Sequence, residues 1–241
     1  MTIRPTSIPL FLAVLLAASP APATITYIDA VEGTSGNTFA TAGSLSDTCW
    51  VGPNSSSTSS TQWNKREGIG DSNGPAIFQG SSSTTPPPEL TTTVTGLAAG
   101  TYTVWAFFWD QIDSDAQNWV LSAGLTSGSL NTYSAPGEPT VPGATTSNVQ
   151  WAGTLSFDSS VNVDGYNDGN PTLLRQLFGI NLGDAVVSGT GSLDVYLGNN
   201  LTTGAANRTW YEGVGYELVP EPSSTALLGL AALSVLRRRR S

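Results

Sequence analysis

The chain has 241 residues, only 11% of them charged, and a net charge of −9 at pH 7. It contains no histidine and a single cysteine, which excludes Ser-His-Asp and Cys-His catalysis, histidine-ligated zinc and an intrachain disulfide. The acidic balance repels nucleic acid, and the shortage of charged residues argues against a helical bundle.

Residues 1–23 have the pattern of a secretory signal peptide. The apolar run Leu10–Ala18 is too short for a spanning helix, and Ala21 and Ala23 are small residues at the positions that signal peptidase reads. Cleavage is predicted after Ala23, because cleavage after Ala21 would place a proline just downstream. Export also agrees with the single cysteine, because stability must then come from a packed core rather than from disulfides.

Residues 24–218 are predicted to form one all-β domain with four basic and 17 acidic residues, a net charge of −13. Short runs rich in Val, Thr and aromatic residues alternate with Gly, Asn, Pro and Ser, without a sustained helical period. Residues 35–60 are expected to be loop, and Leu173–Ile180 stays undecided. The expected strands are Ile25–Val31, Leu90–Leu97, Thr101–Asp110, Trp119–Leu125, Leu130–Tyr133, Val149–Phe157, Asp184–Ser188, Leu193–Leu197 and Arg208–Leu218, while Trp63–Gly70 and Ala76–Gln79 are short pieces around a turn at 71–74.

This strand spacing predicts an antiparallel β-sandwich, with a jelly roll as the favoured topology. The sandwich is expected to be flanked by the signal-peptide helix and by a short C-terminal hydrophobic helix. Within it, Leu90–Leu97 and Thr101–Asp110 are predicted to pair as a β-hairpin around the turn at 98–100.

Both faces of the strand Thr101–Asp110 are apolar. One face must contact the core between the sheets, and the other carries three large rings, Trp105, Phe107 and Trp109. These rings are either an exposed row that stacks on sugar rings or a second buried layer under the long loops. Burial is favoured, because large aromatic side chains usually serve packing.

Acidic loops offer candidate calcium ligands at Asp164, Asp168 and Asn170, because hard cations bind several oxygen atoms from short loops. The segment lacks a regular Asp spacing and a closing Glu, and tight turns favour the same residue types. A turn without metal is therefore favoured, and no other cofactor is expected.

An enzyme without histidine needs carboxylates, chiefly a glycosidase pair. The glutamates are scattered, and no two are spaced as such a pair requires. The domain is therefore expected to be non-enzymatic. The alternative is a secreted glycosidase or lyase, with Glu212 and Glu217 as the residues to test.

The last 23 residues, 219–241, contain three parts in a fixed order. Pro220, Glu221 and Pro222 come first, the apolar run Thr225–Leu236 follows, and the basic cluster ends the chain: Arg237, Arg238, Arg239 and Arg240. Twelve apolar residues are fewer than the roughly 20 of a comfortable span, although arginine side chains can reach back to the interface.

This tail resembles the PEP-CTERM sorting signal. The resemblance implies that a membrane-embedded exosortase recognises Pro220-Glu221-Pro222 and removes the tail. The protein would be anchored in the membrane before processing and would lie at the cell surface or in the extracellular matrix afterwards. Such proteins are often found in bacteria that make exopolysaccharide.

Two further segments, Gly96–Val104 and Arg208–Tyr216, resemble parts of secreted bacterial sandwich domains that include carbohydrate-binding jelly rolls. That resemblance implies a fold that often binds sugar and identifies no binding residue. The expected function is a structural, adhesive or glycan-binding role outside the cell. Signal peptidase, exosortase and extracellular polysaccharide are the expected partners, and nucleic acid is not one.

Overall fold

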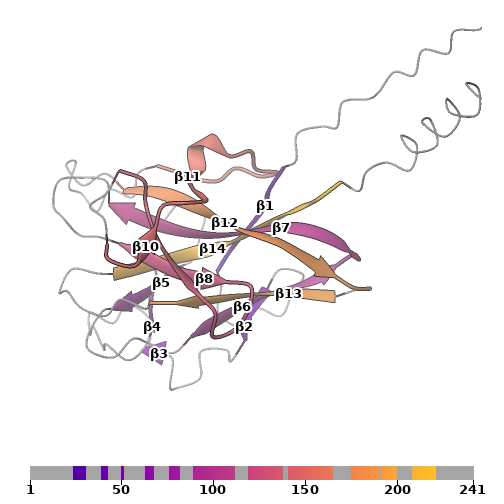
Figure 1. Cartoon of the computed structure of the whole chain (residues 1–241), viewed down its shortest axis with the longest axis horizontal. Helices are drawn as coiled ribbons and strands as arrows, with labels where there is room; N and C mark the ends of the chain where they lie inside the picture. Colours follow the sequence, from indigo (N-terminus) through magenta and orange to yellow (C-terminus); the bar gives the residue numbers. More distant parts are fainter. Residues whose placement is uncertain are drawn as a thin grey trace, which may run out of the picture.

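In the computed structural model, the described residues form two β-sheets that lie one above the other (Figure 1). Most strand pairs are antiparallel, so the predicted all-β sandwich is confirmed. In the described part of the chain, no helix is long and apolar enough to cross a membrane. The described residues are 24–30, 39–42, 50–51, 63–67, 76–81, 89–111, 119–137, 141–164, 175–189, 191–199 and 208–220.

The larger sheet has eight strands in the order β11-β12-β7-β14-β5-β4-β3, and β1 also pairs with β14. All neighbours are antiparallel except β3 and β4. Its longest strands, β7, β12 and β14, lie side by side at its centre. The bounds are β1 Thr26–Asp29, β3 Trp50–Val51, β4 Trp63–Glu67, β5 Ala76–Ser81, β7 Gly100–Gln111, β11 Val149–Trp151, β12 Arg175–Val187 and β14 Arg208–Leu218.

The smaller sheet has six strands in the order β10-β9-β8-β13-β6-β2. Its neighbours are antiparallel except β9 and β10. A 3-10 turn, η1 (Ala152–Thr154), follows β11. The bounds are β2 Phe39–Ala42, β6 Leu90–Leu97, β8 Val120–Gly124, β9 Asn131–Ser134, β10 Ala144–Thr145 and β13 Gly191–Gly198.

The predicted hairpin of β6 and β7 is wrong. β6 pairs with β13 and β2 in the smaller sheet, whereas β7 pairs with β12 and β14 in the larger one. The turn at 98–100 therefore carries the chain from one sheet to the other. The apolar residues Leu90, Val94 and Leu97 of β6 pack in the same core as those of β7. The two strands therefore meet across the core and are not neighbours in one sheet.

Three other boundaries differ from the expectation. The region 35–60, expected to be loop, contains the short strands β2 and β3. The undecided segment and the strand predicted at Asp184–Ser188 join in one strand, β12, with a bulge between Asn181 and Gly183 that breaks the alternation. The strand predicted at Val149–Phe157 ends at Trp151, because η1 begins there.

The apolar residues form two main cores. The inner core lies between the sheets and contains Val104, Ala106 and Phe108 of β7 with residues of β6, β8, β12, β13 and β14. The outer core lies on the other face of the larger sheet and contains Trp105, Phe107 and Trp109 with Leu177 and Trp210. Residues 152–163, which we call the strap, supply Leu155, Phe157, Val161 and Val163 to this outer core.

Candidate functional site

The aromatic row of β7 is buried. Trp105 is 4% exposed, and Phe107 and Trp109 are 0% exposed, because the strap and the first residues of the domain cover them. Tyr27 packs edge-on against Phe107 at a ring-centroid distance of 5.1 Å, and Phe157 lies 5.7 Å from the same ring. An exposed stacking row is therefore contradicted, and the second alternative, a buried layer, is what the structure contains.

The strap crosses the outer face and returns to the edge where it began. Near its middle, the Ile25 N–H donates to the Ser156 carbonyl at 2.9 Å, and the Asp158 N–H donates to the Ile25 carbonyl at 3.0 Å. At its end, the Leu177 N–H of β12 donates to the Val163 carbonyl at 3.0 Å. Among the described residues, these backbone bonds hold a cover that buries several large rings.

Polar groups are enclosed in the outer core. The Trp109 indole N–H donates to the Glu212 carboxylate at 2.9 Å, and the Trp210 indole N–H donates to the side-chain Oε1 of Gln79 at 3.0 Å. The Arg175 guanidinium lies 4.7 Å from the Trp210 ring centre, a cation–π distance. These contacts fix the orientation of the indole rings.

The two glutamates of the enzyme alternative are not arranged as a glycosidase pair. Glu212 is 1% exposed, whereas Glu217 is half-buried five residues further along β14. That separation is about 16 Å along an extended strand. Glycosidase carboxyl groups lie roughly 5–9.5 Å apart, so this pair does not fit the mechanism.

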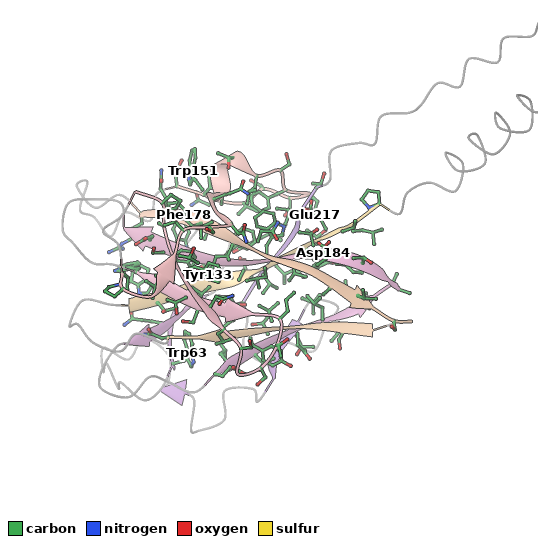
Figure 2. All side chains as sticks on the ribbon, viewed as in Figure 1. Trp63, Tyr133, Trp151, Phe178, Asp184 and Glu217 are labelled. Carbon is green, nitrogen blue, oxygen red and sulfur yellow. The ribbon has the colours of Figure 1, made fainter. Side chains whose placement is uncertain are left out.

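An open groove of about 570 Å³ lies at one edge of the sandwich. β11 and β12 of the larger sheet form one wall, and the turn after β9 of the smaller sheet forms the other. We call it the edge groove; its lining residues are Pro136, Gly137, Val149, Gln150, Trp151, Thr154, Gln176 and Phe178. Figure 2 shows Trp151 and Phe178 beside each other at this edge, on the paired strands β11 and β12.

Local geometry fixes the aromatic wall of the edge groove. A Cβ atom at Gly153 would lie 2.5 Å from the Trp151 ring, so a residue without a side chain is required beneath that ring. The Thr154 hydroxyl donates to the Trp151 carbonyl at 2.8 Å and closes the turn. On the other strand, Phe178 packs at 6.0 Å against Phe108 of the inner core. The aromatic wall is thus continuous with the core.

The residues that line the edge groove include two glutamines, Gln150 and Gln176, and no charged residue. Gln150 is exposed, and the Gln176 amide donates to the exposed Asp164 carboxylate at 3.2 Å. The eight lining residues include neither acid nor base. The groove therefore offers an aromatic ring and amide groups to a ligand, but no group that titrates near pH 7.

Most of the other predicted site residues lie outside the described residues. These are Ala21, Ala23, Asp168, Asn170, Glu221, Pro222 and Arg237 to Arg240. Pro220 is exposed at the end of the described chain. Asp164 is held by Gln176, and among the described residues no group of three or more acidic, histidine or cysteine side chains could hold a metal ion.

Comparison with protein families finds the PEP-CTERM protein-sorting motif at residues 218–240. No curated protein matches the chain. The fold and the tail together define an exported β-sandwich protein. It is anchored at the membrane before exosortase processing and then lies at the cell surface or in the extracellular matrix.

Proposed function

We propose that the domain is a non-enzymatic glycan-binding module that works outside the cell through the edge groove. The observation that supports this most is the half-buried Trp151 ring beside Phe178, with the Gln150 and Gln176 amides on the same lining. Aromatic faces pack on the C–H face of a sugar ring, while amides donate to and accept from its hydroxyl groups.

The shape of the groove also favours a polymer. Its volume lies within the 300–1,000 Å³ range of small-molecule sites, and it is open to solvent rather than enclosed. A chain of sugar rings can therefore enter without passing a closed rim. An adhesive or structural role in a polysaccharide matrix follows from the same contacts.

Charge selects the kind of glycan. The lining has no basic side chain, and residues 24–218 carry a net charge of −13. Acidic polysaccharides would be repelled by such a surface. Neutral glycans are therefore the proposed ligands.

A carboxylate enzyme is the second candidate function, and the described geometry favours it less. Glu212 is enclosed and accepts from Trp109, and no carboxylate lines the edge groove. Release of reducing ends or unsaturated products from a polysaccharide, lost in Glu217→Gln, would favour the enzyme instead.

Glycan-array binding with the processed protein from its host tests the proposal. Gln150→Ala and Trp151→Ala should weaken binding, the latter by about tenfold, which corresponds to 1.4 kcal/mol. Thr95→Ala, an exposed polar position on β6, is the matched control and should bind as the wild type does. Equal binding by all variants, or no binding to any neutral glycan, would contradict the proposal.

A further inference from the structure

The sorting motif begins inside the folded domain. Its first residue, Leu218, is also the last residue of β14. The next N–H, that of Val219, still donates to the Thr101 carbonyl of β7 at 2.8 Å. No linker therefore separates the sheet from Pro220-Glu221-Pro222.

The membrane is close to this end of the sheet while the tail is in place. Six residue steps separate Val219 from Thr225, where the apolar run starts, and they span at most about 21 Å when fully extended. Headgroups occupy roughly 5–8 Å of that distance. A membrane-embedded enzyme must therefore engage the motif in a narrow gap below the folded sheet.

Residues 217–219, which we call the terminal segment, are weakly held. They pair with β7 through Glu217 opposite Thr103 and Leu218 opposite Tyr102, whereas the pairing of β14 with β1 ends at Tyr216 opposite Thr26. Leu218 is 55% exposed, so little apolar burial retains it. Strand ends with few buried contacts open at low free-energy cost.

Tyr216, the residue that precedes the terminal segment, is held much better. Tyr216 lies between β7 and β1, is half-buried, and packs edge-on against Tyr102 at 5.8 Å. Figure 2 shows Glu217 near the end of β14, next to the point where the described chain stops. Opening can therefore reach the terminal segment and stop at Tyr216, without exposing either core.

We propose that the processing enzyme engages the terminal segment as well as Pro220-Glu221-Pro222. Residues 217–219 separate from β7, enter the enzyme as an extended chain, and pair with β7 again once the tail is gone. Enzymes that process peptide chains act on locally opened segments rather than on hydrogen-bonded strands. This inference rests on the sorting motif and is independent of the edge groove.

A linker insertion tests the proposal in the exporting host. Gly-Ser-Gly-Ser between Val219 and Pro220 frees the motif from the sheet, and the same insertion between Pro222 and Ser223 is the matched control. Pulse-chase labelling with intact-mass detection follows conversion of precursor to processed protein. The first insertion should speed conversion several-fold relative to the second. Equal rates in the two insertion variants would overturn the proposal.

A reversible crosslink that locks the terminal segment to β7 tests the same proposal, because it should block processing instead of speeding it. Thr103 and Glu217 are opposite each other, and cross-strand Cα distances of about 4.5–5.5 Å suit a disulfide. Thr103→Cys with Glu217→Cys, in a Cys49→Ser background, should accumulate precursor until a reductant is added. Thr93→Cys with Asp194→Cys, across β6 and β13, is the control and should be processed normally. Normal processing of the first crosslinked protein would show that the enzyme takes the motif without moving β14.

Discussion

The two faces of β7 meet two different kinds of cover. Val104, Ala106 and Phe108 lie in the inner core with residues of the smaller sheet, in which β6 and β13 pair over almost their whole length. Trp105 and Trp109, on the opposite face, lie in the outer core under the strap, which backbone bonds to Ile25 and from Leu177 hold in place. Antiparallel sheets commonly leave one face to water, so the strap is what converts this open face into a second core.

The cores also differ in their chemistry. In the inner core the Tyr211 hydroxyl shares a hydrogen bond of 2.8 Å with the Thr92 hydroxyl, and the rest is mainly apolar packing. In the outer core the indole N–H of Trp109 reaches a buried carboxylate, Glu212. The inner core therefore depends mostly on packing, whereas the outer core depends on packing and on satisfied polar groups.

The largest effect is expected in the inner core. Phe108→Ala removes a fully buried ring, and the free energy of unfolding should fall by about 3–5 kcal/mol. Urea denaturation measures the change. Val186→Ala on β12, where the side chain is 76% exposed, should change stability by less than about 0.5 kcal/mol. A similar small loss for Phe108→Ala would contradict the inner core as described.

In the outer core, losing the hydrogen bond between Trp109 and Glu212 should lower stability more than losing ring volume does. Trp109→Phe keeps an aromatic ring but removes the N–H that donates to Glu212, which should cost about 2–3 kcal/mol. Trp105→Phe is the matched control, because the Trp105 N–H has no hydrogen-bond partner among the described residues. Denaturation of both variants checks the difference. Equal losses would show that the bond to Glu212 contributes nothing beyond ring volume.

Loss of a strap side chain should lower the free energy of unfolding by a smaller amount. Phe157→Ala removes a half-buried strap ring that lies 5.7 Å from Phe107 and 6.0 Å from Tyr27, at a cost of about 2 kcal/mol. Tryptophan fluorescence should shift to longer wavelength, because water then reaches the buried indoles. An unchanged spectrum together with unchanged stability would show that the strap does not seal the outer core.

Part of the fold could be predicted from composition and alternation. The all-β class followed from short runs rich in Val, Thr and aromatic residues, and the two apolar faces of β7 already indicated burial on both sides. The pairing of β6 could not be predicted, because the same alternation fits a hairpin and a turn between sheets. The sheet that β6 joins is decided by β13, a segment about 100 residues away that pairs with β6. The bulge at Gly183 similarly hid the continuity of β12.

The sorting motif could be predicted, and the edge groove could not. The motif is continuous in sequence, so its order of parts is visible without a structure. The edge groove joins Pro136, Trp151 and Phe178 from three separate segments. Trp151 fell inside a predicted strand and Phe178 inside an undecided one, and nothing local shows that β11 and β12 pair. Only the Trp-Ala-Gly sequence, which places Gly153 under the Trp151 ring, was a local signal.

The smallest expected effect is a pH dependence that belongs to the inner core. Burial raises the pKa of the Tyr211 hydroxyl far above its usual 10.0, and the negative charges of Glu212 and Asp29 raise it further, against the Thr92 hydrogen bond, which lowers it. Below pH 10 both the folded and the unfolded chain keep this proton, so stability does not depend on it. Above pH 10 the unfolded chain releases the proton while the folded chain retains it, and the free energy of unfolding should fall by about 1.4 kcal/mol per pH unit.

Urea denaturation of the wild type and Tyr211→Phe at pH 9, 10 and 11 isolates this contribution. Tyr216 also has a raised pKa, mainly from burial, and it is present in both proteins, so the difference between their slopes belongs to Tyr211. The variant should lose stability less steeply above pH 10. Identical slopes would mean that the Tyr211 hydroxyl titrates alike in the folded and unfolded chains, which a side chain sealed between two sheets cannot do.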